Sequence, residues 1–242
     1  NTISLNKYSK VASENKKKIS KNKIAIIYAT GAINSGKGDE NSIGSATTVR
    51  AIRKAAKDKN VKGIVFRVNS GGGSALASDV IFREVILAKK EKPFVVSLGD
   101  YAASGGYYIA CAADSIVANP TTLTGSIGVF GMIPNLKNFY RNKLGINIDT
   151  VNTNKYSDIG INRRLSEFER NKIQTQIEDI YDTFITRVSD GRGIDKSEVD
   201  KIGQGRVWSG YDAKKIGLVD VYGGLETAIN ITASIAEIKD YR

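Results

Sequence analysis

One serine stands in a local sequence that suits a catalytic nucleophile. Ser104 follows the apolar, β-branched run 94–98, which is typical of a buried strand, and precedes the small, helix-compatible residues 109–113. Its neighbours on both sides are alanine or glycine, so another part of the backbone can lie close. A hydroxyl at a helix N-terminus can act as a nucleophile, and the Gly105 N–H can face a developing oxyanion. The alternative interpretation is that Ser104 only caps the helix.

A glycine-rich loop lies one strand earlier, at Asn69–Ser74, with three consecutive glycines. A phosphate cradle is disfavoured, because the loop lacks both a Gly-Lys-Ser/Thr continuation and the G-x-G-x-x-G spacing. A tight turn remains open, since glycine tolerates positive φ. The third interpretation is an oxyanion hole built from unobstructed backbone N–H groups. It is favoured because the loop and Ser104 follow neighbouring strands, which is the arrangement that acyl transfer needs.

The 242-residue chain contains no histidine and a single cysteine. This composition excludes Ser-His-Asp and Cys-His catalysis and histidine-rich zinc sites, and we expect neither a metal nor a cofactor. A serine nucleophile then needs another base. A lysine whose pKa is lowered by burial can accept the serine proton as a neutral amine. Cys111 has no histidine to activate it and is expected to fill the core.

Alternating strands and helices predict an α/β fold. Strands are expected over 24–29, 63–68, 94–98 and 115–118, with a helix capped by Thr47 or Thr48 after the first, a helix carrying residues 77–86 after the second, and a loop over 31–45. Such alternation implies a parallel sheet with right-handed crossovers, which places both candidate loops at the carboxyl ends of strands. The second half is expected to hold helices over 135–143, 165–188, 195–198, 213–217 and 225–238, a strand over 146–151 and an aromatic turn at 207–210.

The basic residues are unevenly distributed. The net charge is +11, and lysines crowd the first 23 residues among serine and asparagine. We interpret residues 1–22 as a basic polar arm or interdomain linker, and residues 23–242 as one domain. Aromatic residues are not interleaved with the basic ones, so a solvated face near anionic lipid is expected rather than a nucleic-acid site.

The ends of the chain and its hydropathy give further expectations. No run approaches the roughly 18 apolar residues of a membrane span. The polar N-terminus does not resemble a signal peptide, and it begins with Asn1 rather than methionine. We therefore expect a processed chain or a fragment, with any membrane anchor outside this sequence.

Three motifs together resemble signal peptide peptidase A, a family of serine peptidases with a Ser/Lys dyad. They are Arg67–Ser74 (RVNSGGGS), Ala102–Tyr108 (AASGGYY) and Leu123–Val129 (LTGSIGV), and residues 205–220 resemble the closing segment of that family. The resemblance runs from about Lys23 to the C-terminus. It implies a crotonase-like (Clp-protease-like) core with flanking helices and a helical C-terminal region.

The resemblance also implies the site and its surroundings. The nucleophile falls on Ser104, the oxyanion donors on Gly105 and on Gly72 and Gly73, and Ser126 matches a serine that holds the family's lysine in place. Implied partners are cleaved signal peptides and further subunits in a homo-oligomeric ring that shares its dyads. The implied location is the extracytoplasmic (periplasmic) face of a bacterial inner membrane, reached through segments outside this chain.

The sequence differs from the family pattern at the position of the dyad lysine. In the matching segment 154–159, Ser157 stands where a lysine is expected, and Lys155 lies two residues earlier. In an extended segment a shift of two residues keeps the same face, so Lys155 remains a candidate base. We favour a different hypothesis, in which this chain is the C-terminal half of a long, duplicated member and the lysine belongs to the other half. A solvated surface role for Lys155 and an inactive scaffold also stay open.

The sequence therefore predicts a serine endopeptidase that acts on apolar, signal-peptide-like segments. One alternative is a catalytically silent assembly domain of the same fold. Another is a crotonase-type thioester enzyme, which would need paired carboxylates or a coenzyme A site near the glycine loop. Asp100 is the one acidic residue beside either motif, so this alternative is disfavoured.

Overall fold

A computed structural model describes residue 4 and residues 20–242, so nearly all of the predicted arm lies outside the described residues. The strands are β1 (Lys23–Thr30), β2 (Ala32–Asn34), β3 (Ser42–Gly44), β4 (Val61–Ser70), β5 (Phe94–Ala103), β6 (Ser115–Ala118), β7 (Leu123–Gly125), β8 (Val207–Ser209) and β9 (Val221–Tyr222). The helices are α2 (Ser45–Lys57), α3 (Ala75–Lys89), α4 (Gly105–Tyr108), α5 (Lys137–Leu144), α6 (Glu167–Arg192), α7 (Lys196–Ile202), α8 (Gly210–Lys215) and α9 (Leu225–Ile235).

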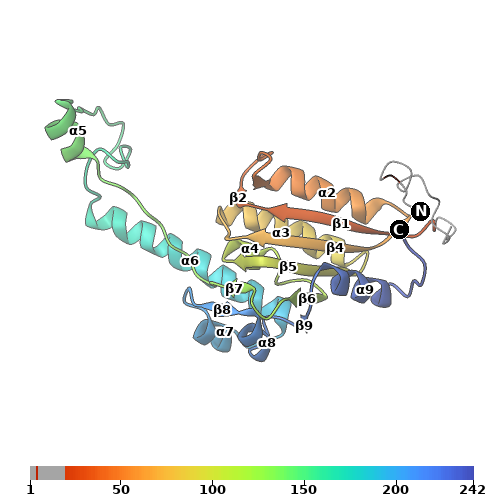
Figure 1. The fold of residues 1–242 in the computed structure, drawn as a ribbon. Helices are drawn as coiled ribbons and strands as arrows, with labels where there is room; N and C mark the ends of the chain where they lie inside the picture. Colours follow the sequence, from red (N-terminus) through yellow and green to blue (C-terminus); the bar gives the residue numbers. More distant parts are fainter. Residues whose placement is uncertain (1–3, 5–19) are drawn as a thin grey trace.

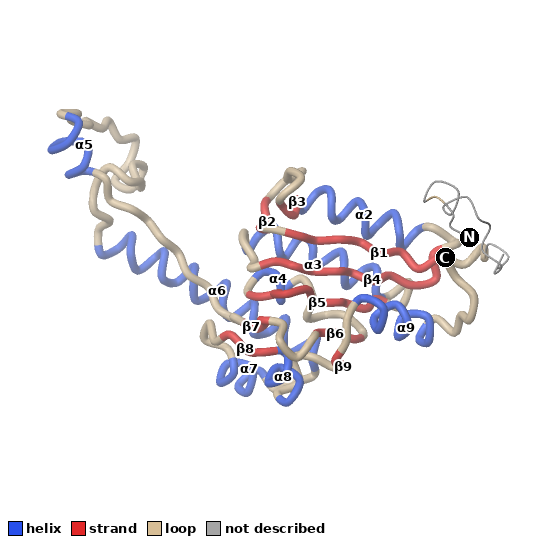
Figure 2. The backbone as a smooth tube through the Cα atoms, in the orientation of Figure 1, coloured by secondary structure: helices blue, strands red, loops and turns tan. Residues whose placement is uncertain are grey.

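The central sheet confirms the predicted α/β architecture. Its strands are parallel in the order β1-β4-β5-β6-β9, and β7 pairs with the end of β5 and carries the antiparallel β8. Helices α2, α3 and α6 pack on one face around the larger core, while α9 covers part of the other face (Figures 1 and 2). The four predicted strands of the first half are β1, β4, β5 and β6, which brings the glycine loop and Ser104 to the same edge.

A long projection leaves this core after β7 and returns along α6, with α5 near its tip (Figure 1). The prediction of a strand over residues 146–151 was wrong, because these residues form an exposed loop of the projection. Ile146 and Ile148 alternate with polar residues as in a half-buried strand, yet about half of each side chain is exposed. No described strand lies beside them to supply ladder hydrogen bonds, and an unpaired strand is not stable.

Two details of the N-terminal half differ from expectation. The predicted loop 31–45 contains the short strands β2 and β3, which pair in parallel. Helix α2 begins at Ser45 with Gly44 before it, so neither Thr47 nor Thr48 is its cap. Within residues 20–242, no helix has both the length and the apolar character needed to cross a bilayer.

Candidate active site

Ser104 sits on a sharp turn between β5 and α4. Its backbone has φ 52° and ψ −123°, a conformation that a residue with a side chain rarely adopts. Its N–H donates to the Gly125 carbonyl at 2.9 Å, and its own carbonyl accepts the Tyr108 N–H at 2.9 Å. Such strain persists where surrounding contacts hold it, and it occurs often at active sites. The turn keeps the half-buried Ser104 at the carboxyl end of the sheet.

The glycine loop lies against this turn. A Cβ added to Gly72 would lie 2.5 Å from the Gly105 nitrogen and 3.0 Å from the Ser104 Cβ. The Gly72 carbonyl accepts the Ile33 N–H at 2.9 Å. Because a trans peptide points its N–H opposite to its carbonyl, the Gly73 N–H faces away from Ile33. A Cβ added to Gly105 would lie 3.2 Å from the Gly73 nitrogen, so two neighbouring N–H groups are available for one oxyanion.

The Gly72 N–H is already occupied. It donates to the Ser70 Oγ at 3.1 Å, and the Ser70 hydroxyl donates to the Gly31 carbonyl at 2.6 Å. In the part of the chain that the structure describes, the N–H groups of Gly73 and Gly105 have no such partner. Of the three predicted donors, Gly73 and Gly105 are therefore the two whose N–H groups are free to bind an oxyanion.

Two polar residues that hold the loop were not singled out from the sequence. Ser70 joins the loop to the turn after β1, as described above. Asn69 accepts hydrogen bonds at its Oδ1 from the N–H groups of Asp100, at 2.9 Å, and Tyr101, at 3.3 Å. The position of these two polar residues, between an apolar strand and a run of glycines, is the feature of the sequence that could have identified them.

A cleft of about 1010 Å³ opens over Ser104. Ser126 lines it as well, and its backbone is held by a 2.7 Å hydrogen bond from its N–H to the Arg206 carbonyl. The outer wall is mostly apolar and comes from α6 and the start of the projection, at Phe130, Ile173, Ile177, Ile180, Tyr181 and Phe184. Among the described lining residues Glu178 is the one charged side chain, and none is a lysine or arginine. The cleft has the apolar lining that an extended apolar peptide needs, and none of the described residues brings an amine into it.

Lys155 lies on the projection rather than in the cleft. Its side chain is exposed, with the Nζ 5.4 Å from the centroid of the Tyr156 ring. Tyr156 in turn stacks on Phe168 near the start of α6, with ring centroids 4.5 Å apart. The structure thus brings Ser104, Gly73, Gly105 and Ser126 together within one chain, but it does not bring Lys155 to them.

A clamp of charged groups fixes the tip of the projection. The Arg163 guanidinium donates to both oxygens of Asp158, at 2.6 and 2.9 Å, and to both oxygens of Glu169, at 2.6 and 2.9 Å. These hydrogen bonds from Arg163 are the main reason that the pKa of each carboxyl falls to about 2. Ser166 completes a capping box with Glu169 at the start of α6.

We expect this clamp to open in acid. A carboxyl whose pKa is depressed in the folded state stabilises the fold above its ordinary pKa, and this stabilisation disappears as the pH falls through the depressed value. The amide chemical shifts of residues 156–168 should therefore change between about pH 4 and pH 2. Arg163→Ala should produce the same changes at neutral pH, whereas Arg164→Ala, which removes a neighbouring arginine outside the clamp, should not. Shifts that stay constant down to about pH 2 would contradict the clamp.

Two other ionisable groups near Ser104 stay protonated at neutral pH. Tyr108 lines the cleft and donates to Asp79 at 2.7 Å; burial, and then this contact, raise its pKa well above 10. Cys111 is fully buried, and burial raises its pKa to about 12. Neither group supplies a base near pH 7, and Cys111 is part of the core, as predicted.

The chain was compared with known protein families and curated proteins. The model of Peptidase family S49 matches residues 86–239, a range that contains Ser104 and Ser126. Protease 4 of Salmonella typhi is 45% identical over 219 residues, which cover 90% of this chain and 35% of that protein. Protease 4 of Haemophilus influenzae is 44% identical over 210 residues, covering 86% of this chain and 34% of that protein.

A shorter relative is the putative signal peptide peptidase SppA of Enterococcus faecium. It is 36% identical over 181 residues, which cover 74% of this chain and 52% of that protein. The chain spans about a third of the length of the two Protease 4 relatives. These matches confirm the resemblance drawn from the three motifs, and the parallel sheet agrees with the crotonase-like fold that it implied. Because the family match covers more than half of its residues, this chain belongs to peptidase family S49.

Proposed function

We propose that this chain is the serine-bearing half of a Ser/Lys endopeptidase, with the lysine supplied by another half of a longer chain or by a neighbouring subunit. One observation carries the proposal. Ser104 stands on a strained turn beside the Gly73 and Gly105 N–H groups, in a cleft whose described lining contains no amine. This arrangement supports Ser104 as the nucleophile and the two N–H groups as oxyanion donors, and it leaves the general base to be supplied from elsewhere.

The proposed reaction follows from these positions. A neutral lysine takes the proton of the Ser104 hydroxyl as the Oγ attacks the peptide carbonyl. The Gly73 and Gly105 N–H groups bind the oxyanion of the tetrahedral intermediate. The intermediate breaks its C–N bond, the protonated lysine gives its proton to the leaving amine, and water then hydrolyses the acyl-serine. We assign to Ser126 the role of holding the lysine amine in the cleft.

The substrates that we propose are apolar peptides such as cleaved signal peptides. The apolar wall from α6 supports this class, because it offers burial to aliphatic side chains and Glu178 is the one charged residue among its described members. The name of the Enterococcus relative, a putative signal peptide peptidase, supports the same class.

The proposed partners are further subunits or the other half of a longer protein. The projection supports this, since Phe130, Met132 and Val151 are 87%, 82% and 100% exposed and have no core of their own. We retain the division into an arm, residues 1–22, and one domain, residues 23–242. We also propose a location at the extracytoplasmic face of a bacterial inner membrane, through segments outside this chain.

The two alternatives make different demands on the cleft. A thioester enzyme of the crotonase type would need paired carboxylates, and Glu178 is the one described acid that lines the cleft. A silent assembly domain would need no amine near Ser104 in any assembled state. We favour the peptidase over both, because the strained serine and the two N–H groups, which have no partner among the described residues, would have no role in a scaffold.

The source of the lysine can be tested in the full-length protein. We expect Lys155→Ala to keep hydrolysis of an apolar fluorogenic peptide within about twofold of wild type, because Lys155 lies on the projection and outside the cleft. Lys172→Ala, on the same projection, is the matched control. A selective loss of about 10²-fold or more in Lys155→Ala would instead assign the base to Lys155 of a neighbouring subunit. A wild-type protein that neither cleaves peptides nor reacts with a fluorophosphonate would favour the silent domain.

A further inference from the structure

Basic side chains gather at one edge of the sheet, opposite the edge that holds Ser104. Lys23 at the start of β1 pairs with Val61 at the start of β4, so both strands begin at this amino edge. Helices α2 and α3 run back from the carboxyl edge, and they end at this same edge at Lys57 and Lys89. The C-terminus lies at this edge as well, beside the start of the described stretch 20–242, since the Asn22 carbonyl accepts the Arg242 N–H at 3.1 Å (Figure 1).

Most of these basic groups are exposed and are not paired with an acid. Within residues 20–242, seven exposed lysines at or beside this edge form no ion pair: Lys21, Lys54, Lys57, Lys59, Lys62, Lys90 and Lys239. The acids nearby are fewer, and two of them, Asp58 and Asp114, are already paired with Lys23 and Lys89. The edge therefore carries an excess of positive charge.

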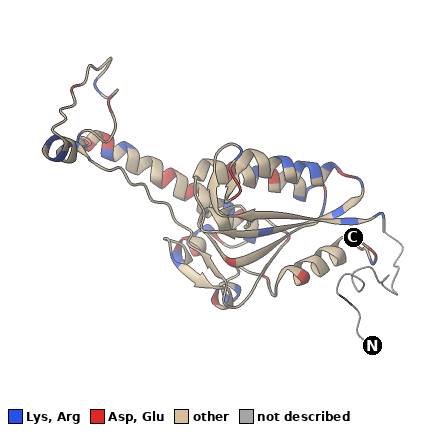
Figure 3. Cartoon of the chain, turned by 45° about the horizontal axis from the view of Figure 1, so that its top comes forward, with Lys and Arg blue, Asp and Glu red and all other residues tan. Residues whose placement is uncertain are grey.

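The charge is segregated on the molecule rather than mixed. Residues 178–226, which form the second half of α6 and the small elements that follow, contain more acidic than basic residues. In Figure 3 the ribbon is blue, the colour of lysine and arginine, at several positions along α2 and at the start of β1. A face that serves solubility alone needs no such separation, whereas an anionic partner explains it.

We propose that this amino edge, defined by the seven lysines above, binds the anionic phospholipid headgroups of a membrane surface. The lysines are spread over several elements as separate point charges, which matches a diffuse array of phosphates. Among these lysines there is no exposed tryptophan or phenylalanine on which bases could stack, so a single-stranded nucleic acid is a poorer match. Binding at this edge leaves the cleft at the opposite edge open to peptides.

This contact goes beyond the membrane association proposed above, because that association lies in segments outside the chain. It is also independent of the peptidase assignment, since none of the seven lysines lines the cleft. The two proposals can therefore fail separately.

The test uses the full-length protein and two kinds of vesicle, phosphatidylcholine alone and phosphatidylcholine mixed with phosphatidylglycerol. We expect tighter binding to the anionic vesicles at low salt, and a loss of this difference at high salt. The variant Lys57→Gln/Lys59→Gln/Lys62→Gln should lower binding to anionic vesicles about 100-fold, since each lysine near such a surface strengthens binding roughly fivefold. Its binding to neutral vesicles and its cleavage of a soluble peptide should not change.

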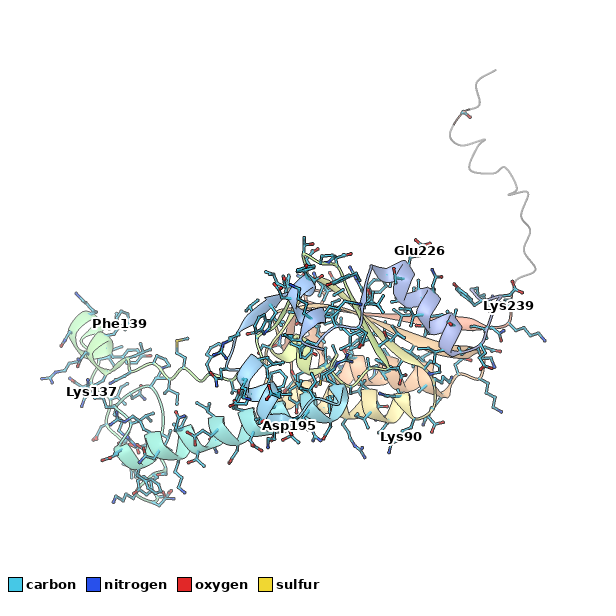
Figure 4. All side chains as sticks on the ribbon, turned by 90° about the horizontal axis from the view of Figure 1, so that it is seen from below. Lys90, Lys137, Phe139, Asp195, Glu226 and Lys239 are labelled. Atoms are coloured by element: carbon cyan, nitrogen blue, oxygen red, sulfur yellow. The ribbon has the colours of Figure 1, made fainter. Side chains whose placement is uncertain are left out.

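A matched variant controls for the loss of net charge. Lys137→Gln/Lys143→Gln/Lys172→Gln removes the same three charges from the projection, which lies at the other end of the molecule from Lys90 and Lys239 (Figure 4). This variant should bind anionic vesicles within about threefold of wild type. Equal losses in the two variants, or no preference of the wild type for anionic vesicles, would overturn the proposal. So would a DNA duplex that releases the protein from vesicles at equal phosphate concentration, because the edge would then be a nucleic-acid surface.

Discussion

Replacing Ser104 with alanine is expected to abolish peptide cleavage by the full-length protein, with a fall in kcat on the order of 10⁴-fold or more. In the proposed reaction the Ser104 hydroxyl oxygen forms the acyl bond. Tyr108 and Cys111 both stay protonated near neutral pH, and Cys111 is buried. Alanine keeps the Cβ, so the strained backbone at φ 52° is equally strained in the variant, and the thermal unfolding temperature should stay close to that of wild type.

The matched control is Ser78→Ala, which removes a hydroxyl from the same cleft. Ser78 donates to the Ser74 carbonyl at 2.9 Å, a contact within α3 and its cap, and its replacement by alanine adds no atom beside Gly105. We expect Ser78→Ala to keep most of the activity and to react with a fluorophosphonate at the wild-type rate. If Ser104→Ala reacts with the probe as wild type does, Ser104 is not the nucleophile.

The core and the location of the site could be predicted from the sequence because long segments carry the signal. Residues 94–98 are apolar and β-branched, and they lie inside β5. The alternation of such runs with helical patterns fixes a parallel sheet, whose loops meet at the carboxyl edge. Ser104 and the glycine loop could therefore be placed together without knowledge of any side-chain contact.

The hydrogen bonds of the oxyanion loop could not be predicted in the same way. Whether Gly72 or Gly73 offers a free N–H depends on Ile33 and Ser70, and Ile33 lies about 40 residues earlier in a three-residue strand. So short a strand contains too few residues for a periodic pattern to appear. The contact is tertiary, and it decides which glycine is available.

The structure of residues 146–151 in the projection could not be predicted from the sequence for a different reason. Apolar residues at 146, 148 and 151 normally indicate burial, but here they lie on an extension that has no sheet beside it. A local pattern of apolar residues indicates that their side chains are buried. It does not indicate whether the surface that buries them belongs to the same chain. The same limit applies to the dyad lysine, which we place outside this chain.

Replacing Gly73 with alanine is expected to lower kcat by about 10²- to 10³-fold while KM changes little, because one oxyanion donor is lost. Gly73 has φ 154°, and a Cβ there would lie 2.2 Å from the Ile33 carbonyl oxygen. The loop must shift to relieve this clash, which breaks the hydrogen bonds to Ile33 that orient the Gly73 N–H. Gly71→Ala is the matched control in the same loop, since a Cβ there meets nothing closer than the Tyr101 ring at 3.8 Å.

Ser70→Ala tests the same N–H without adding an atom to the loop. It removes the hydroxyl that accepts a hydrogen bond from the Gly72 N–H and donates one to the Gly31 carbonyl. The loop then loses both of these hydrogen bonds, while its three glycines are unchanged. We expect a fall in kcat of about 10-fold or more, an unchanged KM, and a parallel loss of affinity for a peptide boronic acid, which mimics the tetrahedral intermediate. Ser70→Thr, which restores a hydroxyl, should recover part of the activity. If Gly73→Ala and Gly71→Ala hydrolyse peptides equally fast, and Ser70→Ala binds the boronic acid as tightly as wild type, the Gly73 N–H is not an oxyanion donor.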